Sequence, residues 1–446
     1  MAAHYGNKGA PTEGRPYKQI RTSDGRSKKN QFMKILFYNH TGQVSGAERL
    51  LLMTLARLDR GNFDPIVVCP EEGPLANMVG HLTLPTEIVP GLEARFTWRL
   101  DLLVRYLKSF FQVMFKLRRQ ISSVKPDLVH ANSIRAGLVA SVATLGLATP
   151  IIWHLHDLLP RHPLSSLIRT FAFLSTRSRM IAVSQAVADN FRGAIAPLQK
   201  RVTVILNAIE LERFCPDEQT GQKMRADLGL AGAEPLIGIV GQLTPRKGQL
   251  ELIQAFAQTL VELPRAVLLI VGAPLFNRDA EYGRLLKQTA ADVGIASQVL
   301  MLGERSDVPA IMQALDLLVI NSTAEPFGLV ALEAMACGTP IVAAVSGGIP
   351  ELIEHNQNGW LVPQGDTQSL ASAMVNLGRQ PELRTRFAEQ GKQHIVARFS
   401  AERFLHELEN FYHYHSGQKP KITHEERAGA KSASEIRLDV QAGGIS

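Results

Sequence analysis

Short apolar runs recur along most of the chain, and most are followed by a polar turn and a longer segment with helical periodicity. The first half contains seven such runs, at residues 35–38, 65–69, 86–89, 127–131, 151–156, 180–184 and 202–206. The second half contains six more, at residues 236–240, 266–272, 299–302, 316–320, 341–344 and 360–362. Because apolar runs that alternate with helices are typical of parallel sheets covered on both faces, the sequence predicts an α/β protein with two doubly wound sheets.

The two series of strands predict two domains, which a length of 446 residues also favours. We expect a first domain at residues 34–209 and a second at residues 210–400, with a hinge near residues 207–217. An aromatic helix follows at residues 401–416, and a polar, loose tail at residues 417–446.

The net charge of +7 is concentrated at the start of the chain. Residues 1–33 contain seven basic residues against two acidic ones, and their low apolar content predicts a disordered leader. This region has no patch of interleaved basic and aromatic residues, so we do not expect nucleic-acid binding. Three widely spaced cysteines outside any CxxC pair, Cys69, Cys215 and Cys337, predict free thiols in a reducing compartment.

The lengths of the apolar segments predict whether the chain crosses a membrane or is secreted. No apolar run reaches the roughly 18–20 residues that a spanning helix needs, and the first residues lack the apolar core of a signal peptide. We therefore expect a cytoplasmic protein.

The segment from Arg99 to Arg119 has the pattern of an amphipathic helix. Apolar side chains share one broad face at about 100° per residue, namely Leu102, Leu103, Tyr106, Leu107, Phe110, Val113, Met114 and Leu117. Basic side chains fall opposite, namely Arg105, Lys108, Lys116 and Arg119. Such a helix can lie on an anionic membrane, at the inner face of the cytoplasmic membrane. The alternative is an ordinary helix packed on the sheet with a solvated basic side.

Two histidines alternate on the predicted strand at residues 151–156, so His154 and His156 point to one face. A zinc site needs a third ligand, and no neighbouring spacing supplies one. His156 ends the strand at the edge where ligands of such sheets bind, so it can orient or deprotonate a substrate hydroxyl. A buried structural role is the alternative.

Two glycine-containing turns join a strand to a helix, where backbone N–H groups can approach an anion. The turn that ends at Gly46 lacks the GxGxxG pattern of dinucleotide binding, and a plain tight turn explains it equally well. The turn at residues 241–248 is not a Walker loop, because Lys247 precedes the last glycine and no Ser or Thr follows it. A lysine at such a turn is still well placed to hold a phosphate.

The segment from Glu325 to Glu333, with the sequence EPFGLVALE, resembles the EX7E motif of glycosyltransferase family 4. Other segments agree with that family in order and spacing and together cover nearly all of residues 34–400. They lie at residues 45–49, 183–185, 205–207, 241–248, 303–308, 347–351 and 358–362.

This resemblance implies a GT-B fold, in which two Rossmann-like domains face each other across a cleft and the C-terminal helix crosses back to the first domain. It implies transfer of a sugar from a nucleotide-diphosphate donor, with retention at the anomeric carbon, to a glycan or lipid-linked acceptor in polysaccharide or glycolipid synthesis. Enzymes of this fold do not require a metal in the cleft, and the chain has no DxD motif. We therefore expect no metal and no cofactor besides the nucleotide sugar.

The resemblance also assigns roles to residues of the motifs. Glu325 would contact the donor sugar, Glu333 the ribose hydroxyls, and His156 the transferred sugar. Lys247 and backbone N–H groups at a helix N-terminus suit a leaving diphosphate. The candidate catalytic residues are therefore His156, Glu325 and Lys247, and the candidate donor-binding residues are Gly46, Arg246, Phe327, Gly328, Leu329 and Glu333.

One position departs from the family pattern, because Gln242 stands where the family commonly has arginine. A neutral amide cannot replace a bidentate phosphate contact, so either Arg246 compensates or the donor is held more weakly. Two alternatives to a glycosyltransferase remain open: a GT-B epimerase or phosphorylase, and a noncatalytic partner that binds sugar nucleotides.

Overall fold

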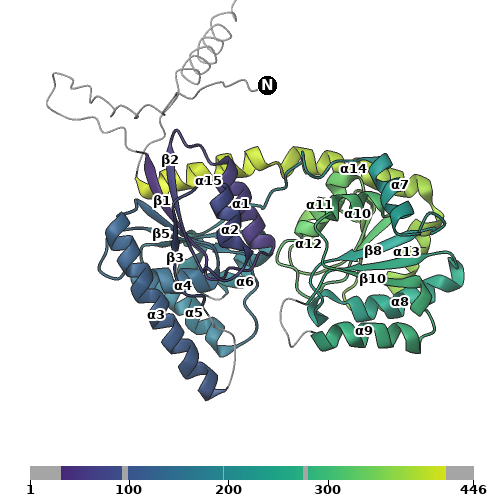
Figure 1. Ribbon diagram of the computed structural model, residues 1–446, viewed down its shortest axis with the longest axis horizontal. Coiled ribbons are helices and arrows are strands. Elements are labelled where there is room, and N and C mark those ends of the chain that lie inside the picture. Colours follow the sequence, from purple (N-terminus) through teal and green to yellow (C-terminus); the bar gives the residue numbers. More distant parts are fainter. Residues whose placement is uncertain (1–31, 93–98, 194, 275–279, 418–446) are drawn as a thin grey trace, which may run out of the picture.

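The computed structural model describes residues 32–92, 99–193, 195–274 and 280–417 and contains two α/β domains side by side (Figure 1). The predicted disordered leader and loose tail lie almost entirely outside the described residues. Each domain consists of one parallel sheet with helices on both faces, as the alternating apolar runs predict.

The sheet of the first domain has seven parallel strands in the order β3-β2-β1-β4-β5-β6-β7. The strands are β1 (Met33–Tyr38), β2 (Phe63–Cys69), β3 (Thr86–Ile88), β4 (Leu128–Ala131), β5 (Ile151–Leu155), β6 (Ser178–Ala182) and β7 (Val202–Val204). The helices between them are α1 (Gly46–Arg57), α2 (Pro74–His81), α3 (Leu100–Val124), α4 (Ile134–Ala143), α5 (Pro163–Leu174) and α6 (Gln185–Arg192), with the 3-10 helix η1 (Ala196–Arg201) before β7.

The sheet of the second domain has six parallel strands in the order β10-β9-β8-β11-β12-β13. The strands are β8 (Leu236–Val240), β9 (Val267–Val271), β10 (Val299–Gly303), β11 (Leu317–Ile320), β12 (Ile341–Ala344) and β13 (Trp360–Val362). Its helices are α7 (Glu218–Asp227), α8 (Gln249–Glu262), α9 (Ala280–Asp292), α10 (Val308–Ala314), α11 (Leu329–Cys337), α12 (Ile349–Leu352), α13 (Thr367–Arg379) and α14 (Pro381–Arg398), with 3-10 turns η2 (Pro245–Lys247) and η4 (Ala296–Gln298).

Strand order reverses at one point in each sheet, between β1 and β4 and between β8 and β11. Loops diverge at such a point and leave a crevice at the carboxyl ends of the strands, where doubly wound sheets bind ligands. The loops that follow these four strands therefore mark the expected site in both domains.

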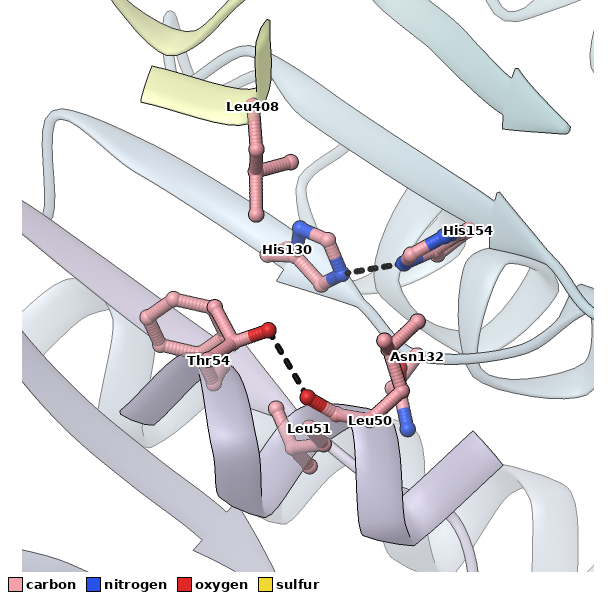
Figure 2. A pocket seen from close by; sticks show the side chains of 8 residues that line it. Leu50, Leu51, Thr54, His130, Asn132, His154 and Leu408 are labelled. Carbon is pink, nitrogen blue, oxygen red and sulfur yellow. Dashed lines mark hydrogen bonds between the residues drawn. The ribbon is translucent and has the colours of Figure 1, made fainter. Parts of the chain in front are cut away.

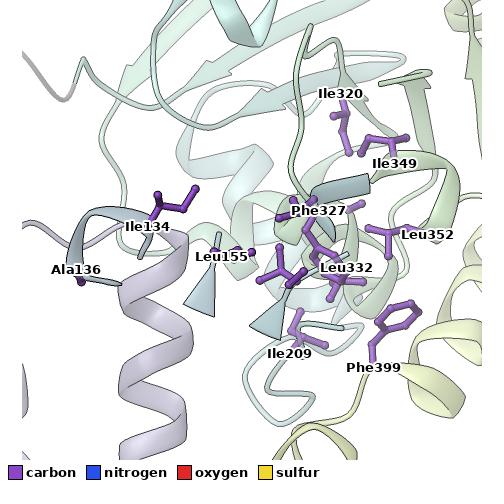
Figure 3. Close-up of a cluster of buried hydrophobic side chains, with 14 of the residues drawn as sticks. Ile134, Ala136, Leu155, Ile209, Ile320, Phe327, Leu332, Ile349, Leu352 and Phe399 are labelled. Atoms are coloured by element: carbon purple, nitrogen blue, oxygen red, sulfur yellow. The ribbon is translucent and has the colours of Figure 1, made fainter. Parts of the chain in front are cut away.

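The two domains contact each other directly. A cluster of buried apolar side chains is continuous between them and includes Leu155 and Val183 from the first domain and Phe327 and Ile349 from the second (Figure 3). Ser184 Oγ donates a hydrogen bond of 2.6 Å to the Pro326 carbonyl oxygen.

A carboxylate also bridges the domains at the start of α6. Glu351 of α12 accepts the backbone N–H groups of Gln185 and Ala186 at 2.7 and 2.8 Å. Because the first N–H groups of a helix lack intrahelical acceptors and carry partial positive charge, this carboxylate satisfies α6 from the opposite domain.

The chain passes between the domains twice, and the two crossings are paired. Ile209 forms a parallel bridge with Ser400, and the Ile209 N–H donates to the Phe399 carbonyl oxygen at 3.0 Å. The last helix of the described residues, α15 (Ala401–Ser416), then packs on the first domain, where Phe404, Leu408 and Tyr412 share one buried cluster with residues of β1 and α1.

The helix α3 projects past the rest of the first domain at its N-terminal end (Figure 1). Residues of the predicted apolar face have two different environments, because Val113, Met114 and Leu117 pack on the core whereas Leu103 and Leu107 are exposed. The solvent-exposed apolar side chains of α3 are Leu103, Val104, Leu107, Phe111 and Phe115. Three of them, Val104, Phe111 and Phe115, lie outside the predicted face.

Candidate functional site

The candidate site is a cleft of about 980 Å³ between the domains. The loops after β1, β4, β8 and β11 all contribute to its lining, as the two reversals of strand order predict. All nine candidate residues from the sequence line this cleft: Gly46, His156, Arg246, Lys247, Glu325, Phe327, Gly328, Leu329 and Glu333. The structure thus brings the predicted residues together, while their individual roles stay predictions.

The turn after β11 needs glycine at Gly328, which has a φ of +106° and forms the N-cap of α11. A β-carbon there would also lie 2.8 Å from Ile349 Cδ1. This conformation directs the N-terminus of α11 into the cleft, where its first N–H groups have no intrahelical acceptors. The end of α11 is therefore a favourable place for an anion.

Lys247 and Glu325 form an ion pair in the cleft wall, with 2.7 Å between Lys247 Nζ and Glu325 Oε2. Their side chains are 16% and 9% exposed, and Ser322 Oγ donates to the same carboxylate oxygen at 3.0 Å. The sequence predicted a separate role for each residue and gave no indication that they pair. Because one charge compensates the other in a poorly solvated place, each is needed to keep the other in position.

Arg246 holds the loop beside this pair. Its Nη1 donates to the Ala324 carbonyl oxygen at 2.7 Å, and its own carbonyl oxygen accepts the Thr323 N–H at 2.8 Å. Arg246 and Gln242 both line the cleft. In this arrangement the guanidinium of Arg246 fixes the turn that carries Glu325.

Glu333 lies in the second turn of α11, and burial raises the pKa of its carboxyl to about 7. Three cations oppose this shift and lower the pKa, namely Arg49, Arg213 and Lys247. Glu333 is thus poised between its neutral and charged forms near pH 7. Arg49 and Arg213 also line the cleft, from α1 and from the first crossing between the domains.

His156 follows β5 and is held by Asn132, whose Oδ1 lies 3.1 Å from His156 Nε2. Asn132 Nδ2 donates to Asn39 Oδ1 at 3.0 Å, which leaves Asn132 Oδ1 as an acceptor and places a proton on His156 Nε2. Burial lowers the pKa of His156 to about 3. A histidine with such a low pKa is a poor general base near pH 7, so orientation of a substrate suits it better than deprotonation.

A buried polar chain lies behind His156. The ring centroids of His154 and His156 are 4.1 Å apart, with the rings tilted by 39°. His154 Nδ1 lies 3.3 Å from His130 Nε2, and His130 Nδ1 lies 2.9 Å from Tyr412 Oη of α15. Figure 2 shows His130 and His154 beside a cavity of about 10 Å³, room for about one water molecule. In the described part of the chain, no three His, Cys, Asp or Glu side chains are arranged to hold a metal ion.

Two family profiles match the chain, one for each domain. The profile described as "Glycosyltransferase Family 4" matches residues 44–213, and the profile described as "Glycosyl transferases group 1" matches residues 221–394. The crystal structure of Anabaena HepE in complex with UDP and glucose shares 30% sequence identity and superposes with a TM-score of 0.72. That match covers 85% of this chain and 99% of HepE. The chain belongs to glycosyltransferase family 4.

Two further relatives of this glycosyltransferase are matched over different shares of their own length. The N-acetyl-alpha-D-glucosaminyl L-malate synthase of Bacillus anthracis is 28% identical over 52% of this chain, and the match spans 58% of that protein. The UDP-Gal:alpha-D-GlcNAc-diphosphoundecaprenol alpha-1,3-galactosyltransferase of Escherichia coli is 25% identical over 75% of this chain and 85% of that protein. These comparisons confirm the predicted family, GT-B fold and glycosyltransferase activity, and they favour that activity over the epimerase, phosphorylase and noncatalytic alternatives.

Sequence reasoning about this glycosyltransferase missed three residues of the cleft, Arg49, Arg213 and Asn132, and the buried His130–Tyr412 pair behind it. Arg49 lies within the segment at residues 45–49 that carried the resemblance, so its position was available. The other groups reach the site from elements far apart in the sequence, which no local pattern indicates. The three cysteines are free, as predicted, with Cys69 and Cys337 buried and Cys215 exposed.

Proposed function

We propose that the enzyme transfers a sugar from a nucleotide-diphosphate donor with retention of anomeric configuration and without a metal ion. The observation that carries this proposal is the position of Lys247, Glu325 and Glu333 around the N-terminal half of α11. Their spacing suits one extended donor, with its sugar at Glu325, its phosphates at the start of α11 and its ribose at Glu333. The positive charge that a metal ion would otherwise supply comes from Lys247 and the helix N-terminus.

The proposed reaction is attack on the same face of the sugar that the diphosphate leaves. The bond between the anomeric carbon and the β-phosphate oxygen breaks, its electron pair goes to the diphosphate, and the acceptor hydroxyl oxygen bonds to that carbon. The acceptor proton passes to the leaving phosphate oxygen. Glu325 is a weak candidate for a covalent nucleophile, because Lys247 and Ser322 both engage its Oε2.

The donor can be identified by binding. The HepE structure contains UDP and glucose, so UDP-sugars are the first donors to test here. A ligand at 100 times its Kd stabilises a protein by about 2.7 kcal/mol, which makes a thermal-shift screen of nucleotide sugars informative. We expect one nucleotide sugar to raise the Tm more than the others. A complete lack of stabilisation across UDP-, GDP-, ADP- and dTDP-sugars would contradict the proposal.

The stereochemistry and metal requirement are tested once the donor is known. NMR of the product should show the same anomeric configuration as the donor, and turnover should be unchanged in excess EDTA. An inverted product would refute same-face transfer. Activity lost in EDTA and restored by a divalent cation would refute metal independence.

We also propose a glycan or lipid-linked acceptor and contact between α3 and an anionic membrane. Four apolar side chains on α3 are about half exposed or more, namely Val104 (68%), Leu107 (50%), Phe111 (49%) and Phe115 (64%). Lys108 and Arg119 lie along one side of this stripe on the helical wheel, an arrangement that suits an interfacial helix at the negatively charged cytoplasmic leaflet. Among the described residues, no helix is long and apolar enough to cross a bilayer.

Vesicle flotation tests the membrane contact. Wild-type enzyme should float with phosphatidylcholine vesicles that contain phosphatidylglycerol and stay behind with phosphatidylcholine alone. The double variant Phe111→Ser/Phe115→Ser should lose this binding. Val261→Ser removes an 81% exposed apolar side chain from α8 in the other domain and serves as the matched control. Equal flotation of the double variant and the wild type would refute a role for the stripe.

A further inference from the structure

The first-domain wall of the cleft carries a group of polar side chains that the proposed donor site does not use. Its members are His40 after β1, Ser133 and Arg135 after β4, and Arg105 on α3. The residues proposed to hold the donor, apart from Gly46 and His156, belong to the second domain. The group therefore lies on the side of the cleft that is left for the acceptor.

The hydrogen bonds within this group determine which ring nitrogen of His40 carries the proton and which atoms donate. Arg135 Nη1 lies 3.4 Å from His40 Nε2, and a guanidinium only donates, so Nε2 is the acceptor. The proton of the neutral imidazole is then on His40 Nδ1, which donates to Ser133 Oγ at 3.0 Å. Ser133 Oγ also accepts the Ala136 N–H at 3.0 Å, so its own hydroxyl proton is directed to a third partner.

Two members of this group, Arg105 and Arg135, carry positive charge where they line the cleft. The guanidinium groups of Arg105 and Arg135 are both on exposed side chains that line it. Glu48, which lines the same wall, has its two carboxylate oxygens engaged by Asn39 and Ser45. An anionic ligand with several acceptor oxygens matches such a surface, and a neutral glycan does not require two arginines.

The helix α3 joins this wall of the cleft to an apolar surface. Arg105 and Tyr106 line the cleft, whereas Val104, Leu107 and Phe111 expose apolar surface on another side of the same helix. At about 100° per residue, Arg105 and Phe111 are roughly a third of a turn apart around the helix axis. One helix therefore offers a cation to the cleft and an apolar stripe beside it.

We propose that Arg105, Arg135 and the Ser133 hydroxyl bind the phosphate of a lipid-linked acceptor, whose apolar tail runs along the exposed stripe of α3. Phosphate oxygens match the fixed forks of two guanidinium groups, and the stripe gives the adjoining hydrocarbon chain a surface to cover. This inference rests on the proposed function, because it takes the acceptor side of the cleft from it.

Binding of a prenyl diphosphate to the full chain tests the inference. The enzyme is first saturated with UDP to occupy the phosphate site at α11, and farnesyl diphosphate is then titrated by calorimetry. In the double variant Arg105→Gln/Arg135→Gln the Kd should rise about 100-fold, roughly tenfold for each lost charge-assisted hydrogen bond. Lys116→Gln, an exposed residue of α3 away from the cleft, should stay within about twofold of the wild type.

Two further probes separate the parts of the ligand. Farnesol lacks the phosphate and should bind weakly and equally to all three proteins. Inorganic pyrophosphate lacks the tail and should bind at least about tenfold more weakly than farnesyl diphosphate to the wild type. Pyrophosphate that binds as tightly as farnesyl diphosphate would overturn the lipid-linked acceptor.

An unchanged Kd in the double variant, or no binding of farnesyl diphosphate to the wild type, would overturn the phosphate site. UDP binding is measured in every variant as the check on fold and on the donor site. Failure of UDP and all other nucleotides to bind the wild type would count against the proposed function itself. Normal nucleotide binding with an insensitive farnesyl diphosphate titration would count against the acceptor inference alone.

Discussion

The raised pKa of Glu333 predicts that donor affinity depends on pH within the physiological range. If Glu333 accepts hydrogen bonds from the ribose hydroxyls, the charged carboxylate is the binding form. With a pKa of about 7, roughly nine in ten carboxyls are charged at pH 8 and one in ten at pH 6. The Kd of the donor should therefore rise about tenfold as the pH falls from 8 to 6.

The sign of this effect follows from which state binds the proton. Burial keeps the carboxyl of the free enzyme protonated above its ordinary range, and the donor must displace that proton. Lower pH therefore favours the free enzyme. Both cleft histidines whose pKa is lowered to about 3, His40 and His156, remain neutral throughout this range and do not contribute.

The measurement is calorimetric titration of the intact nucleotide sugar between pH 6 and 8. An intact sugar diphosphate is used because the terminal phosphate of a free nucleotide itself titrates near pH 6. Glu333→Gln should bind with a Kd that is independent of pH and higher than that of the wild type even at pH 6. Glu304→Gln, which changes another carboxyl that lines the cleft, should keep the wild-type slope.

Two results would refute this reasoning. A flat wild-type profile would show that the charge of Glu333 does not matter for donor binding. A slope that persists in Glu333→Gln would assign the pH dependence to a different group.

Three further predictions concern the neighbouring residues. Lys247→Ala should lower turnover at least about 100-fold, by analogy with the loss of an oxyanion donor, and should destabilise the protein by about 3–5 kcal/mol because Glu325 loses its partner. In urea unfolding, Glu325→Gln in the Lys247→Ala background should recover part of that stability, and no recovery would argue against the pair. Gln242→Arg should lower the donor Kd if Arg246 does not fully substitute for the family arginine, and an unchanged Kd would show that it does. Asn132→Leu should lower kcat about tenfold with little change in donor KM, because His156 loses the acceptor that orients it; an unchanged kcat would remove Asn132 from the positioning of His156.

The fold could be predicted because strands that are buried on both faces of a sheet are continuous apolar runs in the sequence. All thirteen strands fall within or next to the apolar runs, since a strand covered by helices on both sides has no solvated face. The environment of helix α3 was harder to predict, because some of its apolar residues pack on the core and others are exposed. Val113 and Leu117 pack on the core, while Phe111 and Phe115 stay exposed, and hydrophobicity alone does not separate these two uses.

The site was predictable only as far as it is local in sequence. Glu325, Gly328 and Glu333 lie on one turn and helix, so their spacing already carried the geometry. The Lys247–Glu325 pair joins residues 78 positions apart, and the contact of Tyr412 with His130 joins residues 282 positions apart. Such contacts depend on how strands are ordered in the sheet, which follows from the whole fold.

Because α15 packs on the first domain, that domain is not formed by one continuous segment of the sequence. A fragment cut at the first crossing, near residue 213, would lack Phe404, Leu408 and Tyr412 and expose the apolar surface that they cover on β1 and α1. A self-sufficient first domain therefore needs residues 400–417 supplied as a separate peptide or attached by a linker. For the same reason, removal of α15 would destabilise the first domain, whose strands come much earlier in the sequence.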